Sequence, residues 1–276
     1  MDLDSYLRDA TVEWRRGTIS WRAFEDASKL AEADPELKRV QQHVVVLVHG
    51  IRDYALWQNS IRGTLEDWGF KVEPTNYGRI NLLKFLAPVP WFQRRAIRQI
   101  WEQVQMIRQT NESHMISFVA HSFGTLVVSQ ILAQEFSFKA HRLIFCGSVV
   151  PYGFKFQQIQ GRYTSPILNE VGTRDVWPAI AESVTFGYGS GGTFGFRKPP
   201  FRDRWHNGAR HGYFLNAEFC KRFWVPYLID GRIVEDKREL ESPQSWVNFL
   251  SIFKIKYILV GALLVLGIIF LQRIIL

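Results

Sequence analysis

The segment Ala120-His121-Ser122-Phe123-Gly124 places a serine between small residues two positions before it and two positions after it. This spacing is that of the G-x-S-x-G nucleophile turn, with alanine in the place of the first glycine. Small residues are needed because the chain passes so sharply from strand to helix that larger side chains would strike neighbouring backbone. The helix N-terminus beneath the serine favours the negative charge that develops in acyl transfer. We predict that Ser122 is a catalytic nucleophile, with an ordinary helix cap as the alternative.

A histidine-glycine pair follows the apolar run 44–48, in the segment His49-Gly50-Ile51. A loop in this position can give one backbone N–H to the oxyanion of a tetrahedral intermediate, and the residue after the nucleophile gives a second. The amides of Ile51 and Phe123 are therefore the predicted oxyanion hole. Gly50 lets the backbone turn close to the reacting carbonyl. We expect His49 to brace this loop through a hydrogen bond, the alternative being a strand-end histidine with no special role.

Asp175 is the candidate for the acid that orients the catalytic base. It stands in Gly172-Thr173-Arg174-Asp175, directly after a predicted strand at 166–171. A carboxylate in such a strand-end loop can reach an imidazole and fix its tautomer. Asp203, which is nearer to the histidines, and Glu170, within the strand, are the rival acids.

His211 is the candidate for the base itself. It lies in Ala209-Arg210-His211-Gly212-Tyr213, just before a helix-like stretch at 214–229. A neutral imidazole can take the proton of Ser122 and return it to the leaving group at near-neutral pH. His206 is the reserve base. Three other histidines stand at predicted strand starts, at the edge of the sheet opposite to the predicted catalytic residues. They are interpreted as structural: His43, His114 and His141.

From residue 43 onward, apolar runs alternate with stretches of helical periodicity. The predicted strands are 44–48, a strand within 70–77, 115–120, 142–146 and 166–171, and the predicted helices include 55–67, 92–110 and 123–136. Short buried strands joined by helices favour an α/β fold with a mainly parallel, doubly wound sheet flanked by helices. Reactive groups in such sheets collect at the carboxyl ends of the strands, which is where the motifs above are predicted to lie.

The set VHGIRD, VAHSFGT, GTRDVWP and ARHGY resembles the α/β-hydrolase superfamily, in particular its lipase-like and serine-esterase branch, which includes GPI inositol-deacylase-like proteins. The resemblance covers about residues 43–230. It implies a triad of Ser122, Asp175 and His211 with Ile51 and Phe123 at the oxyanion hole. Alanine at position 120 departs from the motif but is familiar in lipase-like members.

Two unusual loops are candidates to shape the substrate pocket. The segment 82–92 is apolar and rich in proline, which suits a lid or a membrane-dipping edge as well as buried packing. The segment 186–196 combines glycine with aromatic residues and lacks a phosphate-loop pattern. A mobile flap beside the base, or a hairpin, is the expectation for it.

The C-terminal segment 257–276 is apolar apart from Gln272 and Arg273. As a helix it would span about 30 Å, the thickness of the hydrocarbon core of a bilayer. We predict a single-pass membrane anchor, the alternative being a buried terminal helix. Lys254 and Lys256 favour placing the catalytic domain in the cytoplasm.

The net charge of +8, from 34 Lys and Arg against 26 Asp and Glu, favours an anionic partner. No Lys/Arg run, zinc-finger spacing or RNA-binding signature accompanies the charge, so a membrane surface is preferred to nucleic acid. The two cysteines, Cys146 and Cys220, are interpreted as buried small hydrophobes. No metal or organic cofactor is predicted.

The expected organisation is an N-terminal helical segment at 1–42, a catalytic domain at 43–235, a linker at 236–256 and an anchor at 257–276. The leading hypothesis is a membrane-anchored serine hydrolase that cleaves lipid or lipophilic acyl esters. The alternatives are a catalytically silent membrane scaffold with the same fold and a protein deacylase or peptidase.

Overall fold

A computed structural model describes residues 43–50, 56–76, 90–111, 114–236 and 245–275. The predicted N-terminal segment 1–42 lies outside the described residues, as do Ile51 and residues 82–89 of the first pocket-shaping loop. Six described strands form one parallel sheet in the order β2-β1-β3-β4-β5-β6. Their bounds are β1 (His43–Val48), β2 (Lys71–Pro74), β3 (Met115–His121), β4 (Leu143–Cys146), β5 (Ile167–Gly172) and β6 (Phe201–His206).

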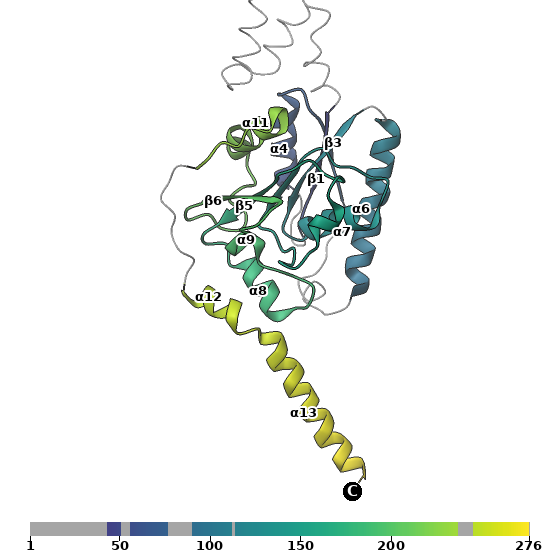
Figure 1. The fold of residues 1–276 in the computed structure, drawn as a ribbon, viewed down its shortest axis with the longest axis vertical. Helices are drawn as coiled ribbons and strands as arrows, with labels where there is room; N and C mark the ends of the chain where they lie inside the picture. Colours follow the sequence, from purple (N-terminus) through teal and green to yellow (C-terminus); the bar gives the residue numbers. More distant parts are fainter. Residues whose placement is uncertain (1–42, 51–55, 77–89, 112–113, 237–244, 276) are drawn as a thin grey trace, which may run out of the picture.

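Helices cover both faces of the sheet (Figure 1). One face carries α6 (Pro90–Thr110), α7 (Phe123–Gln134), the 3-10 turn Phe156–Ile159, α8 (Trp177–Val184) and α9 (Gly191–Phe194). The other carries α4 (Leu56–Glu66), α10 (Ala217–Phe219), the π-helical turn Cys220–Trp224 and α11 (Val225–Asp230). Beyond the domain lie α12 (Ser245–Ile252) and α13 (Ile255–Ile275). The doubly wound parallel sheet is confirmed.

The valines of β1 explain why an unbroken apolar run becomes a central strand. Side chains alternate across a strand, so Val44 and Val46 pack beneath α6 and α7 while Val45 and Leu47 pack beneath α4. All four side chains are fully buried. Cys146 and Cys220 are buried free thiols, as interpreted from the sequence.

Strand β6 was not among the strands predicted from the sequence. Its sequence, FRDRWH, reads as a polar loop because two of its inward side chains are Arg204 and His206. Both are buried because Glu170 on the neighbouring strand binds them. Burial of a charged pair depends on a partner that is distant in the sequence, so local hydropathy could not show it.

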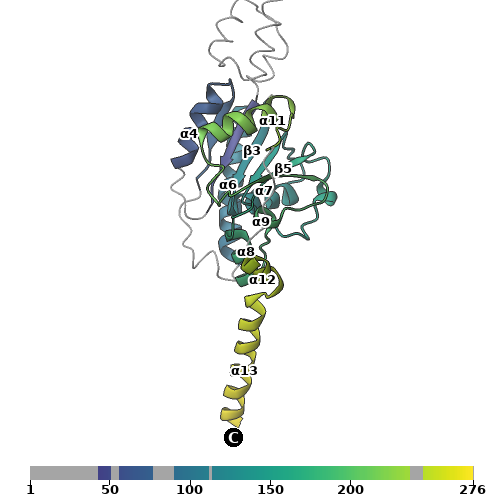
Figure 2. The same ribbon diagram turned by 90° about the vertical axis from the view of Figure 1, so that its left-hand side faces the viewer.

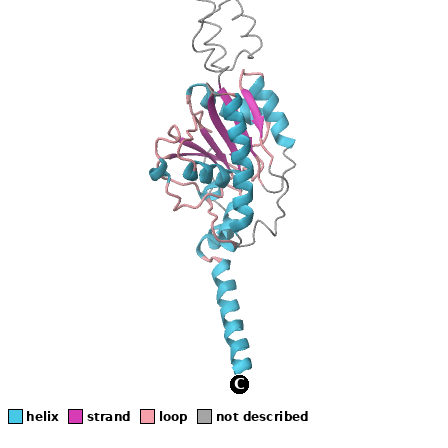
Figure 3. Cartoon of the chain, turned by 90° about the vertical axis from the view of Figure 1, so that its right-hand side faces the viewer, coloured by secondary structure: helices cyan, strands magenta, loops and turns pink. Residues whose placement is uncertain are grey.

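The carboxyl edge of the sheet and α13 lie on the same side of the domain. In Figures 1 and 2, α8, α12 and α13 lie one after another beyond the carboxyl edge of the sheet. This edge is opposite to the one where β1 starts. Figure 3 shows α13 extending away from the domain. Over the part of the chain that the structure describes, no helix is long and apolar enough to cross a membrane. The anchor is therefore a prediction that the structure does not support.

Candidate active site

Ser122 occupies a sharp turn between β3 and α7. Its backbone has φ 54° and ψ −121°, a region that residues other than glycine rarely adopt. Its N–H donates to the carbonyl of Cys146 at the end of β4, at 2.8 Å. Its carbonyl accepts the hydroxyl of Thr125 at 2.7 Å. These two bonds hold the strained turn, and strain of this kind is typical of functional residues.

Two glycines allow the loops around Ser122 to pack against one another. A Cβ added at Gly124 would lie 2.5 Å from the carbonyl oxygen of Val48, so only glycine lets α7 approach the end of β1. A Cβ added at Gly50 would lie 3.0 Å from the Cβ of Ser122 and 3.5 Å from its Oγ. Gly50, which follows β1, therefore lies directly beside the serine, where an oxyanion loop is expected to begin.

Asp175 and His211 form the second part of the site. His211 Nδ1 lies 2.9 Å from Asp175 Oδ2 and 3.0 Å from Oδ1. The side chain of Asp175 is fully buried, whereas that of His211 keeps 21% of its surface exposed. The carboxylate also accepts the N–H of Trp177 at 3.2 Å, and its own backbone carbonyl accepts the hydroxyl of Thr193 at 2.6 Å. The carboxylate of Asp175 is therefore fixed, while the imidazole of His211 stays within reach of solvent.

Gly147 brings this pair to the serine. It follows Cys146, whose carbonyl binds the Ser122 N–H. A Cβ added at Gly147 would lie 2.8 Å from the ring of His211 and 3.0 Å from Asp175 Oδ2. The three candidate side chains thus gather around the ends of β3 and β4, although they are far apart in the sequence.

The predicted oxyanion hole is only partly described. Phe123 begins α7 immediately after the serine, so its N–H belongs to the first turn of that helix, where amides point away from the helix body. Ile51 lies outside the described residues. His49 Nδ1 lies 2.6 Å from the carbonyl oxygen of Gly50, which makes it a donor within this loop.

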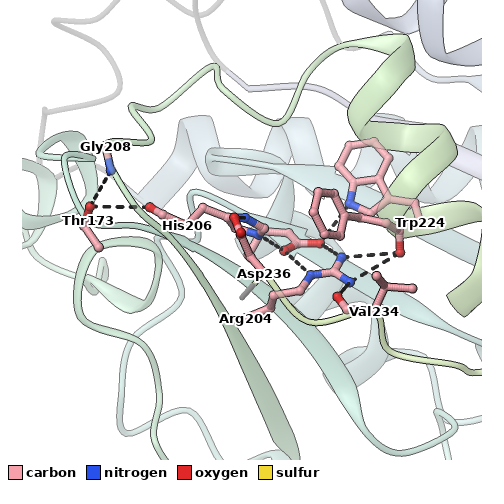
Figure 4. A network of polar contacts seen from close by, with 9 residues as sticks. Thr173, Arg204, His206, Gly208, Trp224, Val234 and Asp236 are labelled. Carbon is pink, nitrogen blue, oxygen red and sulfur yellow. Dashed lines mark hydrogen bonds and ion pairs between the residues drawn. The ribbon is translucent and has the colours of Figure 1, made fainter. Parts of the chain in front are cut away.

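The rival base His206 and the rival acid Glu170 bind each other and further partners in the core. His206 Nε2 lies 2.8 Å from Glu170 Oε2 and His206 Nδ1 lies 3.0 Å from Asp236 Oδ2, so both ring nitrogens have partners. Glu170 also accepts from Arg204 and from the indole N–H of Trp224. Figure 4 shows this network. Burial by itself would raise the pKa of Glu170, but the charge of Arg204 and the hydrogen bonds from His206 and Arg204 lower it to about 2.

The other rival acid supports a loop. Asp203 accepts from the amide of Asn169 at 2.7 Å and from the backbone N–H groups of Phe196 and Arg197 at 3.1 and 2.6 Å. The stretch 186–196 contains the short helix α9 and no strand, so the hairpin alternative was wrong, while the flap alternative stays a prediction. A Cβ added at Gly192 would lie 2.3 Å from the backbone of Gly147, so only glycine allows α9 to pack this closely.

Sequence reasoning missed His121, which precedes the nucleophile. Its Nε2 lies 2.9 Å from the backbone carbonyl oxygen of His211, and the two rings lie 4.5 Å apart between centroids. The signal was present in the motif itself, where a polar residue stands beside the serine, but nothing in the sequence gave its partner. Among the described residues, no group of histidine, cysteine and acidic side chains could hold a metal ion.

Comparison with protein families gives a match over part of the chain. Residues 38–154 match the family model described as "Putative serine esterase (DUF676)". This span includes the loop after β1 and the turn at Ser122. Over these residues, which are fewer than half of the chain, the protein is therefore similar to serine esterases. Its likeness to GPI inositol-deacylases in particular is a prediction that this match does not test. Comparison with curated protein sequences gives no match.

Solved structures resemble the chain weakly. A predicted CIB-like hydrolase from Thermoplasma acidophilum is 14% identical, with 69% of this chain and 87% of that chain covered and a TM-score of 0.44. An alpha-beta serine hydrolase homologue from Coxiella burnetii is 15% identical, with 67% and 83% covered and a TM-score of 0.43. An esterase from Pyrococcus furiosus is 14% identical, with 66% and 83% covered and a TM-score of 0.40. The assignment of the chain does not rest on these likenesses.

Proposed function

We propose that the protein is an active serine hydrolase of carboxylic esters, with Ser122 as nucleophile, His211 as base and Asp175 as the orienting acid. The observation that carries the proposal is the hydrogen-bonded Asp175–His211 pair beside a serine with positive φ. Nδ1 of His211 donates to the carboxylate, so the proton sits on that nitrogen and leaves Nε2 as the basic nitrogen.

The reaction that fits these groups has two halves. Nε2 of His211 takes the proton of Ser122 Oγ as this oxygen bonds to the ester carbonyl carbon. The carbonyl oxygen becomes an oxyanion, which the amides of Phe123 and Ile51 stabilise. The bond from carbon to the alcohol oxygen then breaks, and the imidazolium gives its proton to the departing alkoxide. Water, activated by the same histidine, releases the acid from the acyl-enzyme.

Hydrolysis of a series of p-nitrophenyl esters tests this function. We expect turnover by the full chain in detergent, a preference for longer acyl chains and no turnover by Ser122→Ala. A Ser190→Ala variant is the matched control, because Ser190 lies outside the proposed triad and bonds Glu182. Failure of the folded wild-type chain to hydrolyse any ester in the series would overturn the proposal and favour the silent scaffold.

We further propose that α13 attaches the domain to a lipid bilayer, with the catalytic domain in the cytoplasm. Apolar side chains of α13 are exposed along its length, including Leu263 at 68% and Leu264 at 64% exposure. So large an apolar surface requires a partner. Aromatic side chains in and just after α12 add to it, with Trp246, Phe249 and Phe253 each at least half exposed. A bilayer suits this surface better than a protein groove because the exposed side chains are apolar on successive positions, not on one stripe.

The base of α13 is fixed to the catalytic domain through α8. The hydroxyl of Ser183 lies 3.2 Å from both the carbonyl oxygen of Phe253 and the N–H of Ile255. The ammonium of Lys256 donates to the carbonyl oxygens of Glu182 and Thr185 at 2.7 and 3.1 Å. Since α8 begins two residues after Asp175, attachment through α13 would turn the site toward the bilayer. This supports a substrate ester held in or on lipid.

Flotation with liposomes tests the attachment. We expect the full chain to float with vesicles of phosphatidylcholine and phosphatidylglycerol, and a variant lacking residues 255–276 to remain in the soluble fraction. Sedimentation of the full chain as a dimer without binding to vesicles would show that a second copy covers α13 and would overturn the attachment. Accessibility of the catalytic domain to protease in sealed, oriented vesicles tests the cytoplasmic placement.

A further inference from the structure

His121 joins the nucleophile turn to the loop that carries the base. It is the residue before Ser122, and its Nε2 lies 2.9 Å from the backbone carbonyl oxygen of His211. The His121 ring also contacts the His211 ring, at 4.5 Å between centroids and with an angle of 50° between their planes. Backbone and ring of the base are thus both held by one side chain.

The chemistry of this bond fixes the tautomer of His121. A backbone carbonyl only accepts, so Nε2 must carry the proton and Nδ1 must be the bare acceptor. Nδ1 is buried without a partner among the described residues. It faces Gly50, since a Cβ added there would lie 3.4 Å from it. The imidazole of His121 therefore lies between Gly50, which follows β1, and the backbone of His211.

The surroundings keep this imidazole neutral. His121 is only 5% exposed and packs edge-on against Trp57. Burial lowers its pKa well below the usual value, and the neighbouring rings of His211 and His49 lower it further. A neutral ring donates from one nitrogen only, which keeps the contact with the His211 carbonyl the same whenever the enzyme is folded.

We propose that His121 is a positioning residue. The hydrogen bond from Nε2 of His121 to the backbone carbonyl of His211 sets where the imidazole of His211 lies relative to Ser122. The inference rests on the proposed hydrolase function and deepens it. Without this bond the loop at 209–213 loses its hold on the side next to the nucleophile. The imidazole of His211 would then keep Asp175 as its neighbour but lose its fixed approach to the serine.

The test compares His121→Leu, which cannot donate, with His121→Gln, whose amide nitrogen can replace Nε2 as donor. We expect kcat for p-nitrophenyl butyrate to fall about 100-fold in His121→Leu, the cost of a misplacement of about 1 Å, with KM little changed. His121→Gln should recover most of this loss. The low-field proton resonance of the Asp175–His211 hydrogen bond should broaden or move in His121→Leu and return in His121→Gln.

His43→Leu is the matched control. His43 is also a buried histidine of this sheet, 2% exposed with Nε2 at 2.6 Å from Ser117 Oγ, but it stands at the opposite edge. Both His121→Leu and His43→Leu should lower the thermal stability because each removes a buried hydrogen bond. His43→Leu should do so without the loss of kcat or the change in the resonance. An unchanged kcat in His121→Leu, or a loss that His121→Gln does not recover while the resonance stays the same, would overturn the inference. Inactivity of the wild type would instead overturn the hydrolase proposal, and the resonance would still report on His121.

Discussion

The pair Asp175–His211 and the pair Glu170–His206 each join a carboxylate to an imidazole, and they differ in what surrounds them. Asp175 binds His211 at 2.9 Å, and Glu170 binds His206 at 2.8 Å. Both pairs join residues 36 positions apart in the sequence. The side chain of His211 is 21% exposed and has a second ring nitrogen to offer, whereas that of His206 is fully buried with both nitrogens engaged.

A hydrogen bond between a histidine and a carboxylate is therefore not enough to make a catalytic dyad. Glu170 also receives the buried guanidinium of Arg204, which holds its charge in the core. Such a network specifies how β5 and β6 lie together and offers nothing to a substrate. Asp175 stands past the end of β5, and its pair lies beside Gly147, which follows the residue whose carbonyl accepts the Ser122 N–H. Four predictions concern these two pairs.

The largest effect is expected at the first pair. Asp175→Asn should lower kcat for ester hydrolysis about 10⁴-fold, because the amide favours the wrong tautomer of His211. The free energy of unfolding should change by only about 1 kcal/mol. Steady-state kinetics and urea unfolding of the same preparation measure both. A kcat within tenfold of wild type would show that Asp175 is not the orienting acid.

The second pair should give the opposite result. Glu170→Gln leaves Arg204 buried without its counter-charge and should cost about 3–5 kcal/mol in the free energy of unfolding. Activity per folded molecule should stay the same, since His206 and Glu170 do not reach the serine. Activity is measured at low temperature, where the variant is folded, and normalised to the folded fraction. Lost activity with unchanged stability would exchange the roles of the two pairs.

A smaller effect is expected where the first pair meets the nucleophile. Gly147→Ala would place a Cβ 2.8 Å from the ring of His211, at a residue with φ 55°. We expect kcat to fall about 100-fold as the imidazole is displaced, and stability to fall by about 1–2 kcal/mol from the left-handed backbone. Gly153→Ala is the control, since an added Cβ there meets nothing within 4 Å. Equal kinetics of the two variants would contradict the packing described for Gly147.

The smallest effect concerns pH. The pKa of Glu170 falls from 4.5 to about 2 on folding, so the unfolded chain binds its proton first as pH falls. This carboxylate therefore stabilises the fold above pH 4.5, and its contribution is lost as pH falls from about 4.5 to about 2. The difference between the unfolding free energies of wild type and Glu170→Gln, measured across that range by urea denaturation, isolates the effect. A difference that does not shrink toward pH 2 would contradict it.

The sequence predicted the central strands and the candidate residues Ser122, Asp175 and His211 because each belongs to a local pattern. A run of valines, a serine between small residues and a strand-end aspartate each depend on neighbours a few positions away. Strand β6, the network around Glu170 and the role inferred for His121 depend instead on contacts that are distant in the chain. Hydropathy cannot show that Arg204 is buried, because its burial follows from a partner 34 positions away.

We propose that Asp175 and His211, and not Glu170 and His206, activate Ser122. Reaction of the folded chain with a fluorophosphonate, followed by peptide mapping and measurement of the labelling rate, tests this proposal. We predict one adduct, on Ser122, that forms far more slowly in Asp175→Asn and at the wild-type rate in folded Glu170→Gln. No adduct on folded wild-type protein, or a rate that depends on Glu170 and not on Asp175, would contradict the account.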